Sequence, residues 1–79
     1  MAENPLTLDE HRELAQELRK TVDRLTELAG MVRDVYGSES RSAAAFGEAR
    51  AAMERIRAAL GDQAAADCPG SGAEQLYRS

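Results

Sequence analysis

Few side chains in this sequence are of the types that carry out chemistry. His11 is the only histidine, Cys68 is the only cysteine, and the carboxylates of the N-terminal half are spread along a segment with helical periodicity. Acid–base catalysis requires a carboxylate whose pKa is shifted in a cleft, and nucleophilic catalysis requires a base and an orienting group beside the nucleophile. The sequence offers neither arrangement, so we expect no catalytic residue and no enzymatic activity.

Metal and cofactor sites are not expected either. A metal site needs several ligands at suitable spacing, whereas His11 is isolated and Leu8, not Glu, stands three residues before it. The Gly70-Ser71-Gly72 segment lacks the preceding strand and the following lysine-bearing helix of a phosphate-binding loop. We therefore predict no bound metal and no cofactor.

Three polar residues have both a functional and a structural interpretation. His11 is a phosphoacceptor or a pH-sensitive contact between subunits, or else a boundary residue that covers the end of an apolar seam. Thr21 sets the register of helix packing, or else donates its hydroxyl to its own helix turn. Cys68 is a redox sensor or an intersubunit disulfide, or else an inert thiol without a basic neighbour. We favour the structural interpretation for all three.

Two amphipathic segments provide the elements that would hold these residues. Apolar side chains recur every three or four residues along the first half of the chain and again over residues 46–60, with alanines beside them. This is the period of helices that pack on other helices. The residues predicted to form the core or a subunit interface are Leu14, Leu18, Val22, Leu25, Leu28, Val32, Val35, Phe46, Met53, Ile56 and Leu60.

Local signals set the bounds of the first helix, which is predicted to cover about residues 8–36. Thr7 and Glu10 have the spacing of a capping box, so the helix should begin directly after Thr7. Residues 1–6 are expected to form a flexible lead. Gly37 marks the end of the helix, because glycine readily adopts the left-handed conformation that closes one.

The second helix is predicted to cover about residues 40–60, or to continue to residue 66. Gly61 favours the earlier end, whereas matching the length of the first helix favours continuation. Proline and glycines follow, so residues 67–79 are expected to form a disordered tail. The folded part is then a helical hairpin over residues 7–66.

The predicted fold class is all-α, a two-helix antiparallel hairpin. The short polar connection makes the helices antiparallel neighbours, and Tyr36 is expected to pack on Phe46 at the closed end. A chain of 79 residues with one cysteine has little core of its own, and each helix of a lone hairpin would leave half of its stripe exposed. We therefore expect two hairpins to dimerise into a four-helix bundle.

Charge and hydropathy limit the classes of partner that the protein is expected to bind and the cellular compartment in which it is expected to occur. The net charge of −4 argues against duplex nucleic acid, because phosphate binding needs a clustered basic face. No apolar run approaches the length of a membrane span, and the N-terminus lacks the basic and apolar regions of a signal peptide. With its single cysteine, the chain is predicted to be cytoplasmic, with no nucleic-acid or membrane partner.

The first helix also carries a family resemblance. The segment from Glu10 to Val22, EHRELAQELRKTV, resembles the dimerisation helix of one class of histidine kinases, whose pattern is roughly Glu-Arg-x-Arg-Ile-Ala-Arg-Glu-Leu-His-Asp. Such domains are helical hairpins that dimerise into four-helix bundles. Arg19 and Lys20 stand where that family has its phosphorylated histidine and the adjacent acid. The resemblance therefore implies a regulatory dimerisation hairpin without phosphotransfer.

These observations favour a small non-enzymatic helical interaction or dimerisation protein whose partner is a second copy of itself. Two alternatives stay open. One is the regulatory hairpin implied by the resemblance, and the other is a helical subunit whose apolar stripe is completed by a different helical protein. A self-complementary stripe and one completed by another protein look the same in a single chain.

Overall fold

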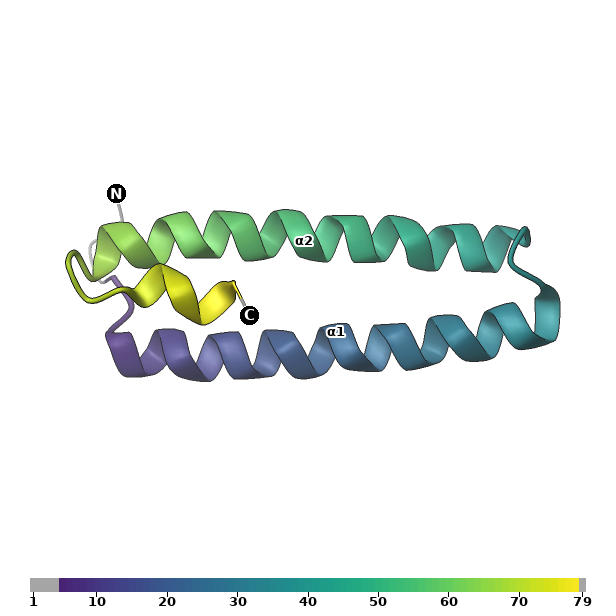
Figure 1. Cartoon of the computed structure of the whole chain (residues 1–79), viewed down its shortest axis with the longest axis horizontal. Helices are drawn as coiled ribbons and strands as arrows, with labels where there is room; N and C mark the ends of the chain where they lie inside the picture. The colour runs from purple at the N-terminus through teal and green to yellow at the C-terminus, as the bar shows by residue number, and fades with distance from the viewer. Residues whose placement is uncertain (1–4, 79) are drawn as a thin grey trace.

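The fold is a long helical hairpin whose open end is closed by a short third helix. The structure, a computed structural model, describes residues 5–78 and contains α1 (Leu8–Tyr36), α2 (Arg41–Asp67) and the 3-10 helix η1 (Ala73–Tyr77). Figure 1 shows α1 and α2 side by side and antiparallel, with η1 beside them at the end where α1 begins and α2 ends. The molecule measures 46 × 19 × 18 Å. No helix among residues 5–78 has the length and apolar character needed to cross a membrane.

The bounds of α1 agree with the capping signals of the sequence. The Thr7 hydroxyl accepts a hydrogen bond from the Glu10 backbone N–H at 3.1 Å, and the Glu10 carboxylate accepts one from the Thr7 N–H at 2.9 Å. This reciprocal pair satisfies backbone donors that the first helical turn leaves open. Gly37 closes the helix with φ of 92° and donates its N–H to the Arg33 carbonyl.

Ser40 caps the start of α2, and the helix is the longer of the two that the sequence allows. The Ser40 hydroxyl accepts a hydrogen bond from the Ala43 N–H at 3.1 Å. The helix then passes through Gly61 and continues to Asp67. This length keeps the first turns of α1 in contact with a neighbouring helix.

The C-terminal segment differs from the predicted disordered tail. Asp67 belongs to α2, and residues 73–77 form η1, whose Ala73 and Tyr77 are buried. The physical reason is that Leu76 and Tyr77 cover apolar surface that the two helices leave open at this end. Of the predicted flexible lead, residues 1–4 lie outside the described part of the chain.

The buried core sits at the open end. Ala15, Ala64, Ala73 and Tyr77 form its centre, and half-buried side chains pack around it, namely Leu8, Leu14, Leu18, Leu60, Cys68 and Leu76. Toward the hinge the seam is thinner. Ala29 is buried there, whereas the larger predicted core residues are only half-buried, namely Val22, Leu25, Leu28, Val32, Phe46 and Met53.

The structure disagrees with the prediction at two core residues and at one contact near the hinge. Val35 is 73% exposed and Ile56 is 43% exposed, so neither belongs to the core of one hairpin. Tyr36 is 70% exposed, so its predicted burial against Phe46 is wrong. The cause is geometric: the helix period places these side chains on an apolar face, but two helices can cover only the part of it that faces the neighbour.

Leu25→Asp tests the seam between the helices. The substitution removes a half-buried apolar side chain and places a charge there, so we expect the free energy of unfolding to fall by about 2–4 kcal/mol. Chemical denaturation followed by circular dichroism measures it. Thr26→Asp, one residue further along α1 and exposed, adds the same charge outside the seam. Equal stability of the two variants would remove Leu25 from the packed seam.

Candidate functional site

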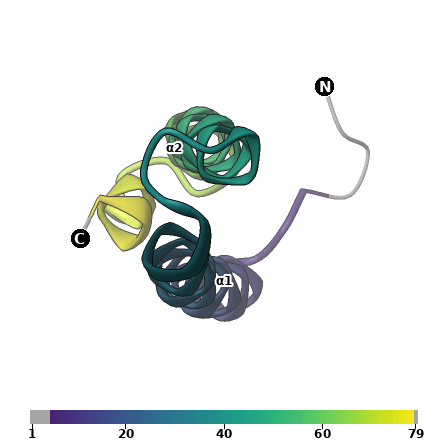
Figure 2. The same cartoon turned by 90° about the vertical axis from the view of Figure 1, so that its right-hand side faces the viewer.

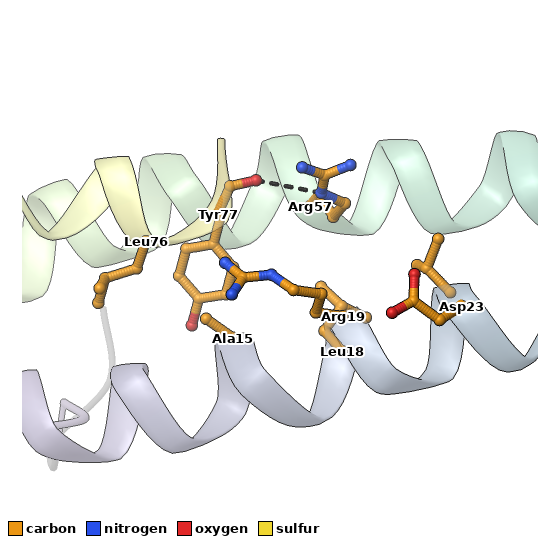
Figure 3. A pocket seen from close by; sticks show the side chains of 8 residues that line it. Ala15, Leu18, Arg19, Asp23, Arg57, Leu76 and Tyr77 are labelled. Carbon is orange, nitrogen blue, oxygen red and sulfur yellow. Dashed lines mark hydrogen bonds between the residues drawn. The ribbon is translucent and has the colours of Figure 1, made fainter. Parts of the chain in front are cut away.

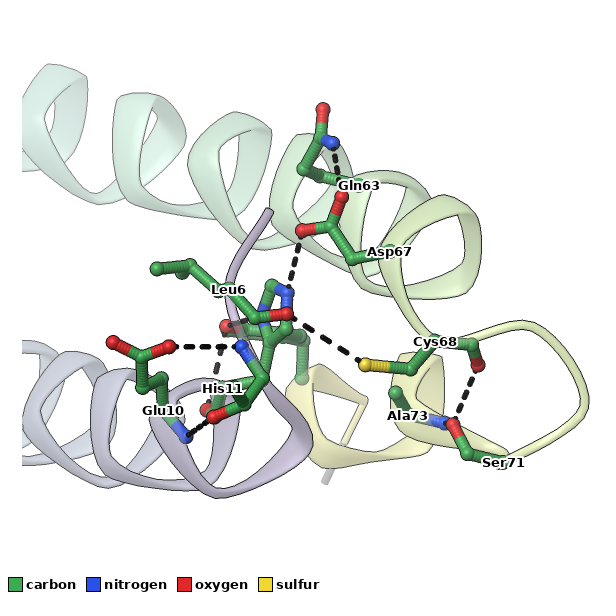
Figure 4. A network of polar contacts seen from close by, with 10 residues as sticks. Leu6, Glu10, His11, Gln63, Asp67, Cys68, Ser71 and Ala73 are labelled. Atoms are coloured by element: carbon green, nitrogen blue, oxygen red, sulfur yellow. Dashed lines mark hydrogen bonds and ion pairs between the residues drawn. The ribbon is translucent and has the colours of Figure 1, made fainter. Parts of the chain in front are cut away.

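The most highly structured polar site in the molecule surrounds His11. Its side chain comes from the first turns of α1 and is 0% exposed. It lies where the start of α1, the end of α2 and the end of η1 meet (Figure 4). The capping box upstream fixes the start of α1, and the His11 N–H continues the helix by donating to the Thr7 carbonyl at 2.9 Å.

Both ring nitrogens of His11 have partners from distant parts of the chain. Nε2 lies 2.9 Å from Oδ2 of Asp67, and Nδ1 lies 2.8 Å from the hydroxyl of Tyr77. The two rings also meet edge to face, with centroids 5.8 Å apart and an angle of 89° between their planes. The second carboxylate oxygen of Asp67 accepts a hydrogen bond from the Gln63 side chain at 2.8 Å. His11 therefore joins α1 to both α2 and η1.

The geometry accommodates the imidazole in either charge state. In the neutral form Nε2–H donates to the Asp67 carboxylate and Nδ1 accepts from the Tyr77 hydroxyl. In the charged form both nitrogens donate, and the hydroxyl turns to the His11 carbonyl, which lies 3.4 Å away. Within residues 5–78, every buried side-chain nitrogen and oxygen has a hydrogen-bond partner. The network is thus fully satisfied, which a buried polar group requires.

The contacts shift the acidities of both partners. The hydrogen bond from His11 holds the pKa of Asp67 below its ordinary value of 3.8, and the hydrogen bond from Gln63 acts in the same direction. Burial raises the pKa of Tyr77 above its ordinary value of 10.0, and the nearby charge of Asp67 adds to the effect. An ionised Asp67 and a protonated Tyr77 are therefore the states that the fold favours.

The order carboxylate, imidazole, hydroxyl is also that of a catalytic triad. A triad needs a hydroxyl that a substrate can reach, with hydrogen-bond donors beside the reacting atom. Tyr77 is 4% exposed, and its hydroxyl is directed into the protein against His11. This arrangement holds η1 on the hairpin and leaves no room for a substrate at the hydroxyl. We therefore interpret it as a structural clasp, which we call the His11 clasp.

Comparison with known proteins does not identify a family or a function for this site. Searches of protein-family models, curated proteins and solved structures found no match to the chain. The function is therefore argued from the site and the surface alone.

Sequence reasoning located His11 but missed its partners. The structure places His11 at that end of the seam, as the favoured interpretation expects, but the side chain is fully buried and is not a boundary residue. Asp67 and Tyr77 both lie in the segment that the sequence predicts to be a disordered tail, so the sequence does not identify either as a hydrogen-bond partner of the imidazole. Leu76 and Tyr77, which follow the Pro-Gly-Ser-Gly turn of residues 69–72 after three intervening residues, are the sequence signal that a short segment folds back.

The other singled-out residues have structural roles. The Thr21 hydroxyl donates to the Glu17 carbonyl at 2.9 Å, which confirms the bond to its own helix turn. Cys68 is a free, half-buried thiol whose Sγ lies 3.8 Å from the Leu6 carbonyl oxygen. No group of three or more His, Cys, Asp or Glu side chains within residues 5–78 is arranged to hold a metal ion.

Tyr77→Phe tests the clasp. It keeps the buried ring but removes the hydroxyl, which leaves Nδ1 of His11 without its partner, so we expect the free energy of unfolding to fall by about 1–3 kcal/mol. Amide hydrogen exchange should increase first in residues 73–77. Tyr36→Phe removes the hydroxyl of a tyrosine that is 70% exposed and serves as the control. If the two variants were equally stable, the hydroxyl would not hold η1.

The lowered pKa of Asp67 makes stability depend on acidity in a definite direction. Since the folded-state pKa lies below the unfolded value of 3.8, the carboxylate stabilises the fold above that pH, and the contribution is lost as the pH falls through the folded pKa. We expect Asp67→Asn to be less stable than the natural protein at neutral pH, and the difference to shrink in acid. Denaturation at stepwise lower pH measures this, with exposed Asp62→Asn as control. A difference that stays constant with pH would contradict the assignment.

Proposed function

We propose that the protein is a non-enzymatic helical interaction module that forms a homodimer, with two hairpins packed into a four-helix bundle. One observation carries the proposal. Large apolar side chains stay exposed in the single chain: in the hinge half of α1, Met31 is 60% exposed and Val35 is 73% exposed, and near the middle of α2, Ile56 is 43% exposed. Apolar residues exposed together on one face of a small protein indicate a protein–protein contact.

The exposed apolar face lies on the side of the hairpin away from η1. Arg19 of α1 lines the groove beside η1, and a helix turns about 100° per residue, which puts Leu28 on the opposite side of α1. Leu28 and Val35 are seven residues apart and share that side. On α2 the same face carries Ile56 and a heptad column of small residues, Ala45, Ala52, Ala59 and Ala66. Figure 2, viewed from the hinge, shows η1 on one side of the helix pair only.

The shape of the single chain supports a second subunit. Its radius of gyration is 15.4 Å, whereas a compact domain of this length has one of about 12 Å. Each of the three exposed side chains contributes up to roughly 1.5–3 kcal/mol when fully buried. Two-fold symmetry uses each of them twice, which is of the order needed to offset an association cost of about 4–15 kcal/mol.

The charges of the two helices are compatible with a second copy on this face. Helix α1 carries seven acidic and five basic residues, while α2 carries four arginines and four carboxylates and is neutral overall. Packing two hairpins face to face in a four-helix bundle sets α1 of one copy beside α2 of the other. The net negative α1 of one copy then lies next to the neutral α2 of the other, so two negative helices are not placed side by side. The column of alanines lets the helices approach closely.

Mass in solution tests the proposal. Size exclusion with light scattering should give twice the chain mass down to about micromolar concentration. The double variant Met31→Glu with Val35→Glu should give a single chain mass while keeping its helical circular dichroism. The control Gln16→Glu with Thr26→Glu adds the same charge to α1 at exposed positions away from this face and should remain a dimer.

Two outcomes would overturn the homodimer. A fully helical, thermally cooperative monomer at all concentrations would mean that the face needs no partner. A poorly helical monomer that folds only when a different protein is added would mean that another chain completes the seam.

A further inference from the structure

The side of the hairpin beneath η1 is a groove between α1 and α2. Figure 3 shows the Tyr77 ring directed toward Ala15 of α1, while the Tyr77 carbonyl accepts a hydrogen bond from Arg57 of α2 at 3.1 Å. Beyond Tyr77 the groove continues as a cavity of about 150 Å³ that is lined by all three elements. The groove is therefore longer than the five-residue helix that lies in it.

The floor of this groove is made of small residues. Ala15 and Ala64 are buried beneath η1, and a Cβ built at Gly61 would touch the Glu74 carbonyl oxygen at 3.8 Å. Small side chains at a contact let helix axes come close together. Without η1 this floor and the half-buried leucines beside it would form an apolar strip in water, and such a strip favours association with another helical surface.

The hold of η1 on the groove comes from the hairpin and not from η1 itself. A 3-10 helix of five residues has little stability of its own. Its connection to α2, residues 68–72, contains Gly70 and Gly72 with φ of 78° and 73°. The side chains of His11 and Arg57 hold Tyr77 in place. The segment can therefore leave without breaking a backbone-to-backbone hydrogen bond of α1 or α2.

The short connection gives η1 an advantage over any segment from another molecule. A segment on a short flexible connection acts at an effective concentration on the order of millimolar. A second copy of the chain competes only at its own, lower concentration. The segment therefore keeps the groove as long as its contacts with His11 and Arg57 are intact.

The charges beside the groove do not select a partner of one sign. On α1 and α2, the cavities beside η1 are lined by three arginines and three carboxylates, namely Arg12, Arg19, Arg57, Asp23, Glu54 and Asp62. A strongly acidic or strongly basic partner would be repelled by half of them. A second copy presents the same balanced set, and two-fold symmetry applies each contact between two copies twice.

We propose that η1 is an autoinhibitory lid that prevents a second copy of the chain from packing into this groove. With the lid in place, the face away from η1 is the side that associates. With the lid released, the seam is open on both sides, and contacts on both sides join copies into assemblies larger than a dimer. The proposal rests on the proposed homodimer only for the size of the closed assembly, because the lid acts on the other side of the seam.

A reversible disulfide tests the lid within one protein. A Cβ built at Gly61 would lie 4.0 Å from Cβ of Tyr77, and the Cβ atoms of a disulfide are about 3.5–4.5 Å apart. The triple variant Gly61→Cys, Tyr77→Cys and Cys68→Ser should therefore lock η1 in the groove when oxidised. When reduced, it lacks the ring and the hydroxyl that hold η1 on His11, so the lid is released.

Size exclusion with light scattering compares the two states. The oxidised variant should have the mass of the natural protein, while the reduced variant should stay helical by circular dichroism and have at least twice that mass at about 100 μM. Amide exchange in residues 73–77 should be faster in the reduced state. The natural protein, whose single cysteine is Cys68, should keep its mass with and without reductant.

Tyr77→Phe releases the lid more gently. It keeps the buried ring and removes only the hydroxyl bonded to His11. We expect the larger species to form in this variant too, but at a higher concentration than in the reduced triple variant. The control Tyr36→Phe, at an exposed tyrosine, should keep the mass of the natural protein.

The outcomes separate the lid from the homodimer. Equal masses of helical oxidised and reduced states would overturn the lid, and the homodimer would stand if both states were dimers. A monomeric natural protein whose reduced variant associates would support the lid and overturn the homodimer. If the reduced variant lost its helices, Tyr77→Phe would decide, because a mass equal to that of the natural protein at every concentration would overturn the lid.

Discussion

Two helices that pack side by side leave the apolar seam between them open on two sides, and this constraint governs the rest of the molecule. At the open end the chain covers one side with its own C-terminal segment, which brings Leu76 and Tyr77 over the seam. The core of the molecule is concentrated where this third element is present. Toward the hinge, where η1 does not reach, Ala29 is buried but the larger apolar side chains of the seam are only half-buried. The distribution of burial thus follows the number of elements that meet at each level of the hairpin.

The His11 clasp holds a segment that would otherwise be too short to remain in place. Five residues of 3-10 helix have few internal hydrogen bonds and bury little surface. Tyr77 compensates with a hydroxyl bonded to His11, a backbone carbonyl bonded to Arg57, and an aromatic ring packed on the imidazole. Asp67 would be unfavourable at the negative end of α2, but its carboxylate accepts hydrogen bonds from His11 and Gln63. The buried imidazole therefore holds both the end of α2 and η1 against the start of α1.

The sequence predicts what depends on neighbours along the chain. The capping box at Thr7, the cap at Ser40 and the stop at Gly37 are local, and the helix bounds follow from them. The contact between His11 and Tyr77 joins residues 66 positions apart, and residues 73–77, although four of the five are good helix formers, are too few to predict a helix from the local pattern. Periodicity also marks Val35 and Ile56 as apolar-face residues without saying whether a neighbour is present to cover them. Whether an apolar-face residue is buried depends on the elements that pack against it. A single chain determines that burial only where its own helices meet.

The two sides of the helix pair differ in the apolar surface that a single chain leaves exposed. The side away from η1 presents Met31, Val35 and Ile56, whose burial is driven by apolar area and is indifferent to charge. The side that holds η1 is covered at the open end, where Leu76 and Tyr77 pack over the seam. The two sides of the seam therefore differ in what they leave exposed, and the proposed homodimer would use the side that η1 does not cover.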